Sequence, residues 1–270
     1  MNNTLIDNSI EALSMTATLR KCLDIDGIQT VSIATGYWDI PGLAILQKSL
    51  RSFIEKDGTT LRLLIGKDPY IYANQLKSPK YKDANYPLDF IKTDIHELNV
   101  TEEYKDAIRL LLDYCTENND SKIQIRVFRK NENDETQFLH SKCYIFDGKS
   151  NGIGIGIVGS TNFTQKGLQG NAELNYIETA PNQVLSLDEI PGNKSHLIWF
   201  NEKWEISEPW NKQFLEQILK SAPITDEVEK ERRNKELPFT PYELYIKLLQ
   251  IKFGDIVDKS LGQQIETYLP

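Results

Sequence analysis

Seven residues between positions 140 and 173 have types and spacings that suit chemistry on a phosphate. They are His140, Lys142, Asp147, Gly159, Ser160, Asn162 and Glu173. An imidazole and an ammonium group placed side by side repel each other unless an anion lies between them, and a phosphate supplies that anion. The hydroxyl of Ser160 and the amide of Asn162 are short neutral donors for phosphate oxygens. The pattern therefore favours a phosphate pocket over a packed face.

The elements that carry these residues must bring them to one edge of a sheet. Side chains alternate faces along a strand, so a strand over residues 138–146 puts His140 and Lys142 on the same side. Asp147 begins a predicted hairpin turn, and a second strand then ends at the small residues 159–162. A third strand over residues 172–179 carries Glu173, a carboxylate suited to fixing the orientation of a histidine.

Each of these residues also has an ordinary structural explanation when it is taken alone. A single histidine is most often a core or surface residue, a single lysine is usually solvated, and residues 159–162 suit a helix cap. Asp147 is most simply a turn residue, so we assign it and Gly159 structural roles. Together, in this order and at this spacing, the residues favour the functional interpretation.

The first 128 residues predict helices that alternate with strands. Apolar residues at helical spacing predict a mostly helical segment over residues 1–29. Strands are predicted over residues 30–35 and 60–65, with a helix between them that has Pro41 in its first turn. A strand–helix–strand unit makes its two strands parallel. Open α/β sheets bind ligands at the carboxyl ends of their strands, which lie here at residues 36–39 and 66–68. A helix over 101–117 and a strand over 123–128 follow.

Residues 67–98 combine lysines and tyrosines with three prolines and little periodicity. Basic and aromatic side chains in one loop suit a polyanion with stackable bases, and the alternative is a solvated surface insertion. The candidate nucleic-acid contacts are Tyr37, Lys67, Lys77, Lys80 and Lys82.

Composition narrows the class of protein. The net charge of −8 weighs against a general nucleic-acid coat, although residues 62–92 contain six Lys or Arg and three Asp. Three scattered cysteines without a CxxC pair argue against a disulfide framework and a zinc site, and they fit a cytoplasmic location. No apolar run approaches the ~18 residues of a membrane span, and no secretory signal is recognisable, so no membrane partner is predicted.

The pattern His-x-Lys-x4-Asp, followed by Gly-Ser-x-Asn and a downstream Glu, resembles the signature of the phospholipase D superfamily. The eleven residues between Asp147 and Gly159 make the hairpin longer than is usual in that family. The resemblance implies an α/β fold, namely an α/β/α sandwich with a mixed, largely parallel sheet and a small helical C-terminal extension.

The resemblance also implies a mechanism. One motif supplies half a site, so a homodimer is expected in which one His140 attacks phosphorus to form a phosphohistidine and the other protonates the leaving oxygen. Lys142 and Asn162 are expected to bind the non-bridging oxygens with help from Ser160, and Glu173 to orient a histidine. No metal and no other cofactor is predicted.

A second resemblance covers more of the chain. The segments GYWDIPGL, LLIG and TPYELYIKLLQIKFGD resemble the N-terminal modules of bacterial helicases and restriction-type proteins, in which a phospholipase D-like domain precedes a motor. We therefore expect a catalytic domain over residues 1–222 and a charged linker with a helical extension over 223–270. The helicase or ATPase domain is expected in a longer parent chain or as a partner, because no Walker A sequence occurs.

The leading prediction is a metal-independent, dimeric phosphodiesterase that acts on DNA. The rivals are a phospholipase or phosphatidyl-transfer enzyme, and a catalytically silent module that binds DNA or dimerises for a helicase. Residues 193–220 are dense in aromatic side chains, which predicts core packing or a dimer seam, with base stacking as the weaker alternative.

Overall fold

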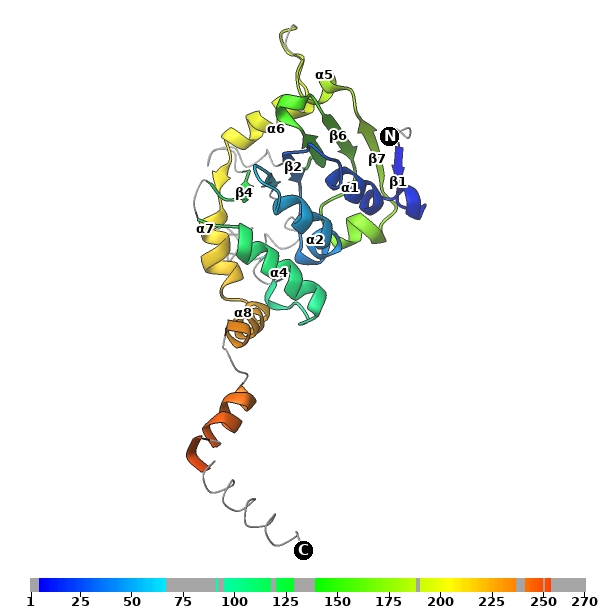
Figure 1. The fold of residues 1–270 in the computed structure, drawn as a ribbon. Helices are drawn as coiled ribbons and strands as arrows, with labels where there is room; N and C mark the ends of the chain where they lie inside the picture. The colour runs from blue at the N-terminus through cyan, green and yellow to red at the C-terminus, as the bar shows by residue number, and fades with distance from the viewer. Residues whose placement is uncertain are drawn as a thin grey trace, which may run out of the picture. The chain divides into compact units, whose positions relative to one another are not determined.

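An eight-stranded mixed sheet forms the centre of the fold (Figure 1). The computed structural model describes residues 5–66, 91, 95–117, 120–128, 139–187, 190–236, 241–249 and 251–253. The strands are β1 (Leu5–Asp7), β2 (Thr30–Thr35), β3 (Thr60–Ile65), β4 (Ile123–Val127), β5 (Cys143–Asp147), β6 (Gly154–Gly159), β7 (Leu174–Glu178) and β8 (Glu208–Pro209). Their order across the sheet is β1-β7-β6-β5-β2-β3-β4-β8.

The predicted α/β fold with a mixed sheet is confirmed, but the sheet is not largely parallel. Only β2–β3 and β3–β4 are parallel, and the other five neighbouring pairs are antiparallel. The physical reason is the length of the connections. The six residues between β5 and β6 are too short for a crossover, so β6 returns antiparallel beside β5, and β7 returns in the same way beside β6 after residues 160–173.

Helices cover both faces of the sheet. The first face carries α1 (Met15–Leu23), α2 (Ile40–Ile54) and α4 (Glu102–Tyr114), and the other carries α5 (Pro181–Val184) and α6 (His196–Glu205) (Figure 1). Shorter helical segments are η1 (Glu11–Leu13), η3 (Lys149–Asn151), η4 (Lys166–Gly170), α7 (Asn211–Gln213) and η5 (Phe214–Leu219). Under α6, Phe200 and Trp204 pack against Ala34, Leu64 and Ile145 of the sheet.

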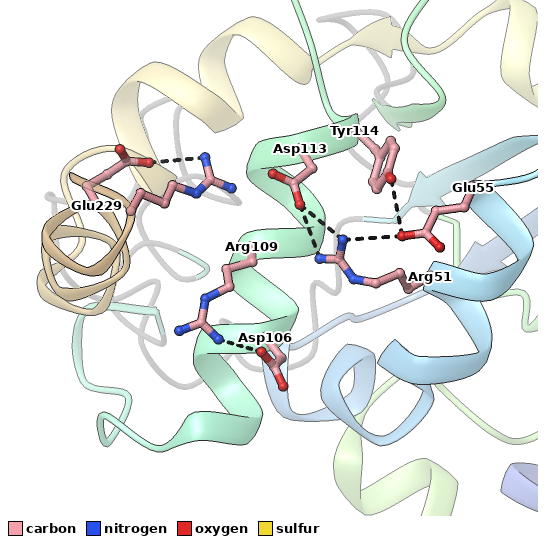
Figure 2. Close-up of polar contacts among 8 residues, drawn as sticks. Arg51, Glu55, Asp106, Arg109, Asp113, Tyr114 and Glu229 are labelled. Atoms are coloured by element: carbon pink, nitrogen blue, oxygen red, sulfur yellow. Dashed lines mark hydrogen bonds and ion pairs between the residues drawn. The ribbon is translucent and has the colours of Figure 1, made fainter. Parts of the chain in front are cut away.

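Two of the helices on the first face, α2 and α4, are joined by ionic contacts as well as by apolar packing. Arg51 of α2 donates from both terminal nitrogens to Asp113 Oδ2 of α4, at 3.1 and 3.2 Å. Figure 2 shows this pair together with Glu55, which accepts a hydrogen bond from the hydroxyl of Tyr114. These side chains are partly exposed, so the contacts add little to the free energy of folding and serve mainly to align α4 with α2.

The N-terminal segment differs from the prediction. The sequence predicts a mostly helical segment over residues 1–29, and α1 confirms part of that prediction. Leu5–Asp7, however, form β1, which pairs antiparallel with β7 at the edge of the sheet. A three-residue strand has no readable alternation, and its partner lies far away in the sequence, so local periodicity does not predict it.

The aromatic residues of 193–220 belong mainly to the core. Phe200, Trp204, Trp210 and Phe214 are buried. The rings of Trp38 and Phe214 pack in a tilted arrangement with centroids 5.5 Å apart, and the guanidinium of Arg62 lies 4.8 Å from the Phe200 ring centroid. Burial lowers the pKa of Arg62, opposed by the charges of Asp147 and Glu205. Core packing was therefore the correct alternative for these four residues.

The chain divides into two compact units, Met1–Thr225 and Asp226–Pro270. The helix α8 (Pro223–Glu236) begins at the end of the first unit, and helical residues 241–249 and 251–253 belong to the second. Within the described residues, no helix combines the length and the apolar character needed to cross a bilayer.

Candidate active site

The residues of the predicted pocket gather at one edge of the sheet, which we call the motif edge. The carboxyl ends of β2, β3 and β6 meet there with the amino ends of β5 and β7, because β5 and β7 run against β2 and β6. The segment 139–142 enters β5 at this edge, residues 160–164 leave β6, and Glu173 precedes β7. The topology thus brings three separated pieces of the motif together.

Gly36, the first residue after β2, is the point at which two of these pieces meet. A side chain at this position would begin 3.1 Å from Cδ2 of His140 and 3.4 Å from Oδ1 of Asn162. The absence of a side chain therefore lets the imidazole and the amide approach the same stretch of backbone. The sequence predicts that residues 36–39 lie at a ligand-binding edge of the sheet, and the place of Gly36 at the motif edge agrees with that prediction.

The amide of Asn162 has a defined orientation. Its Oδ1 accepts a hydrogen bond from the backbone N–H of Tyr37 at 3.3 Å and lies 3.3 Å from the hydroxyl of Thr35. A backbone N–H can only donate, so the oxygen of the amide must face it. The Nδ2 group, which is a donor, is then turned away from Tyr37.

The buried hydroxyl of Thr35 joins the end of β2 to the loop after β6. It accepts a hydrogen bond from the backbone N–H of Phe163 at 3.0 Å and donates to the carbonyl oxygen of Tyr37 at 2.6 Å. Both partners flank the contact between Tyr37 and Asn162. Sequence reasoning missed Thr35, because a threonine at the end of a β-branched strand looks like any other strand residue.

The segment before β5 differs from the predicted strand. We expected a strand over 138–146 with His140 and Lys142 on one face, but β5 begins only at Cys143. His140 is exposed, whereas Lys142 is buried and donates from Nζ to the backbone oxygen of His140 at 2.7 Å. Residues 140–142 precede the hydrogen-bonded part of the strand, so their side chains need not alternate between its faces. The side chain of Lys142 turns back toward the backbone of His140. Both residues still lie at the motif edge.

The family assignment can be made from the same stretch of chain. The description "Cardiolipin synthase, PLD-like domain" matches residues 27–190, which are more than half of the 270 residues and include all seven motif positions. The chain belongs to the phospholipase D superfamily. The membership predicted from the His-x-Lys and Gly-Ser-x-Asn pattern is confirmed. No match was found among curated proteins.

Several solved structures are similar to the chain at low identity. Nuc of Salmonella typhimurium is 14% identical over 76% of this chain and 95% of its own, with a TM-score of 0.41. NucT of Helicobacter pylori is 11% identical over 76% and 97%, with a TM-score of 0.38. Phosphatidylserine synthase of Haemophilus influenzae is 15% identical over 80% and 42%, with a TM-score of 0.44.

The second part of the phospholipase D motif, Gly159 to Glu173, is tightly packed. A side chain on Gly159 would begin 2.3 Å from Oδ1 of Asn175 and 2.5 Å from the backbone oxygen of Leu174, so only glycine fits. The hydroxyl of Ser160 donates to one oxygen of Glu173, and the amide of Asn171 donates to the other at 3.0 Å. Glu173 is therefore fixed beside Ser160, and its expected action on a histidine stays a prediction.

Asn175 supports this phospholipase D motif from inside the sheet. It is 2% exposed, accepts a hydrogen bond from the backbone N–H of Thr161 at 3.2 Å, and donates to the Thr161 hydroxyl at 2.8 Å. The hydroxyl of Tyr144 donates to the Thr161 carbonyl at 2.9 Å. The sequence motif does not include Asn175, and its only signal is a polar residue at an inward position of a strand.

Of the remaining predicted positions, Asp147 lies at the opposite end of β5, Tyr37 lies at the motif edge, and the others lie outside the described residues. Asp147 ends β5, where Oδ1 accepts a hydrogen bond from the N–H of Lys149 at 2.6 Å as the chain turns into η3. Tyr37 takes part through its backbone and is half-buried, so nucleic-acid contact by its ring stays a prediction. The candidate contacts Lys67, Lys77, Lys80 and Lys82 lie outside the described residues.

Asp39 ties the amino end of α2 to the loop of the phospholipase D motif. Its Oδ1 accepts hydrogen bonds from the N–H groups of Gly42 at 2.6 Å and Gln165 at 3.0 Å. Burial raises the pKa of Asp39, and these two hydrogen bonds oppose that shift. Across the residues that the structure describes, no three His, Cys, Asp or Glu side chains gather as a metal site.

Proposed function

We propose that this protein is a metal-independent phosphodiesterase that cleaves DNA as a homodimer through a phosphohistidine intermediate. The observation that carries the proposal is the meeting of His140 and Asn162 at Gly36. A nucleophile and a donor of neutral hydrogen bonds thereby share one exposed edge of the sheet. Membership of the phospholipase D superfamily supports the reaction class.

The proposed reaction has two steps. In the first, a ring nitrogen of His140 attacks phosphorus, a nitrogen–phosphorus bond forms, and the bond to the leaving oxygen breaks. The partner subunit's His140, in its imidazolium form, gives its proton to that oxygen. In the second, the now neutral imidazole takes a proton from water, whose oxygen attacks phosphorus and releases His140. The exposure of His140 suits attack on a polymeric substrate.

The neighbouring residues are proposed to stabilise the charge that develops on the phosphate oxygens. The orientation of Asn162 leaves Nδ2 as the donor, since Oδ1 faces Tyr37. Lys142 provides a positive charge beside His140, and electrostatic stabilisation of this kind is usually the largest contribution to such catalysis. Ser160 assists, with its hydroxyl held by Glu173.

DNA is the proposed substrate because of the lysines and tyrosines in the sequence 67–98, which suit a backbone and stackable bases. Phosphatidyl transfer is the second candidate, since the matching family description names cardiolipin synthase. A helicase or ATPase in the parent chain, or as a partner, stays a prediction. So does the alternative of a silent module that only binds DNA or dimerises.

Cleavage of plasmid DNA in EDTA, measured beside release of headgroup from phospholipid vesicles, tests the proposal. Wild-type protein should cut DNA with EDTA present, and His140→Ala should abolish cutting while DNA binding is retained. His96→Ala is the matched control, because His96 bonds to Ser221 outside the motif edge, and it should cut like the wild type. Cleavage that requires a divalent metal, or that survives in His140→Ala, would contradict the proposal. Headgroup release without DNA cleavage would favour the second candidate.

A further inference from the structure

A cavity of about 250 Å³ lies at the amino end of α2. Residues 38–41 form one part of its lining, and Ile95, Glu97 and Leu98 form another. Glu97 is exposed and Leu98 is half-buried, so the cavity opens to solvent. Packed interiors contain few voids larger than a water molecule, so a space of this size is better suited to a ligand than to a packing defect.

The lining of this cavity combines an apolar floor with two acidic groups. Trp38 and Ile40 are each 1% exposed, and Ile95 is 2% exposed, so they form its deep part. Asp39 and Glu97 supply the charges, and no Lys, Arg or His occurs among the described residues that line it. Two carboxylates repel a phosphate. The cavity therefore suits an uncharged group that has apolar faces and N–H donors at its edge.

Backbone contacts join the cavity to the candidate active site. Trp38 pairs with Phe163 in a parallel bridge, and the N–H of Asp39 donates to the Phe163 carbonyl at 3.4 Å. Gly36, where His140 and Asn162 meet, is two positions before Trp38, so the two Cα atoms are at most ~7 Å apart. A phosphate at the motif edge and a group in the cavity can therefore belong to one substrate.

The other part of the lining comes from the end of the segment that we propose contacts DNA. Ile95, Glu97 and Leu98 are near the C-terminal end of the sequence 67–98, which is rich in lysine and tyrosine. A base is the uncharged part of a DNA strand, with apolar faces and a polar edge. The exocyclic amino group of adenine, cytosine or guanine can donate to a carboxylate, whereas thymine has no such group. Enzymes that hold a base outside the stack use pockets with these properties.

We propose that the cavity beside Trp38 binds one base of the DNA strand and prefers a base with an exocyclic amino group. This inference rests on the proposed function, in which DNA is the substrate, and it names the part of the strand that is held beside the motif edge. An ammonium headgroup of a phospholipid is the other chemistry that two carboxylates attract. An ammonium group loses its hydration against Trp38, Ile40 and Ile95, whereas the faces of a neutral base are stabilised there.

Binding of short single strands to full-length His140→Ala protein tests the cavity without cleavage. One fluorescent probe is a run of thymidines, and the other is the same run with one dC at its centre. The two bases have the same ring size and differ at the amino group, and the protein can slide until the dC enters the cavity. Fluorescence anisotropy should show binding of the dC probe that is about tenfold tighter, within the range that one good base contact gives.

Two variants in the His140→Ala background assign this preference to the cavity. Glu97→Ala removes an acceptor at an exposed position, so the fold should persist and the two probes should bind equally. Leu98→Trp fills the cavity and should also abolish the preference, with an unchanged melting temperature. Glu11→Ala is the matched control, because Glu11 is an exposed glutamate on η1 that does not line the cavity. It should keep the tenfold preference.

The outcomes separate the cavity from the proposed function, because cutting of plasmid DNA is measured independently with the wild type. A preference for the dC probe that only the Glu97 and Leu98 variants lose supports the cavity, even if the wild type cuts no DNA and the proposed function fails. Equal binding of the two probes by His140→Ala protein overturns the cavity and leaves the function standing if the wild type cuts. Equal binding, together with attachment to phosphatidylethanolamine vesicles that Glu97→Ala abolishes, also overturns it and assigns the cavity to an amine headgroup.

Discussion

At the scale of single residues, the candidate site depends on Thr35 as much as on the motif. Thr35 carries no reacting group, but its hydroxyl accepts from Phe163 N–H and donates to the Tyr37 carbonyl. Those two backbone groups set the position of Asn162, whose Oδ1 faces Tyr37. Thr35 is therefore a positioning residue for the donor that we propose binds phosphate.

Thr35→Val should destabilise the protein and reduce cleavage, while Thr35→Ser should behave nearly as the wild type. Valine has the shape of threonine but leaves the buried N–H of Phe163 without an acceptor, which costs about 1–3 kcal/mol. Urea unfolding measures the free energy, and plasmid cleavage at saturating DNA measures the rate. Equal stability and equal rates for wild type and Thr35→Val would show that the hydroxyl does not position the loop.

At the scale of elements, Asp39 links the start of α2 to the loop that follows β6. Burial raises the pKa of its carboxyl, so the folded protein holds the proton more tightly than the unfolded chain does. The stabilising contribution of this shift is therefore complete below the ordinary value of 3.8 and is lost as the pH rises through the native pKa. At neutral pH the charged carboxylate of Asp39 destabilises the fold relative to a neutral group, although its Oδ1 still caps α2.

Asp39→Asn should consequently be at least as stable as the wild type at pH 7, since the amide oxygen can accept both hydrogen bonds without a charge. Its advantage should shrink as the pH falls toward 3. Asp39→Ala should lose about 1 kcal/mol, because it removes the cap. Free energies of unfolding between pH 3 and 8 measure all three proteins. An Asp39→Asn protein as unstable at pH 7 as Asp39→Ala would mean that the negative charge itself is needed.

The sequence predicted those elements that have a strong local pattern. The strands over 30–35 and 60–65 match β2 and β3, and the predicted helix over 101–117 contains α4. The local hydrophobic pattern gave wrong predictions where pairing between distant strands decides the structure. β1 exists only because β7 offers a free edge, and the segment before β5 has the alternation of a strand but lies outside the ladder.

For the site, types and spacing were enough to select the motif residues, but not to find the residues that orient them. Thr35 acts by a hydrogen bond from the backbone N–H of Phe163, 128 positions away in the chain. The sequence contains no sign of that contact, because its partner is a backbone atom present at every position. Asn175 bonds to the backbone and the hydroxyl of Thr161, and its only signal was a polar residue at an inward position of a strand.

At the scale of the whole molecule, burial makes the thiols of the three cysteines unreactive. Burial raises the pKa of Cys22, Cys115 and Cys143 each to about 12 from an ordinary value of 9.0. All three thiols should therefore stay protonated at pH 8 and react slowly with a disulfide reagent. The thiol contribution to stability should be complete below pH 9.0 and should be lost as the pH rises toward 12.

Titration with Ellman's reagent at pH 8 measures this prediction, with and without urea. Three thiols should react promptly in urea, and the folded protein should release almost none in the same time. Rapid reaction of one thiol in the folded protein would contradict the burial of that residue.

The position of Gly36 has a consequence for how activity arises during folding. Strands β5, β6 and β7 follow one another by short links, so their contacts are local and can form early. Thr35 and Asn162, by contrast, are 127 positions apart in the chain. The two halves of the motif edge come together only when β2 closes against β5, a loop closure with an entropic cost. Recovery of cleavage after denaturation therefore reports on that long-range closure, while the hairpins that contain most of the motif can be complete in a chain that is still inactive.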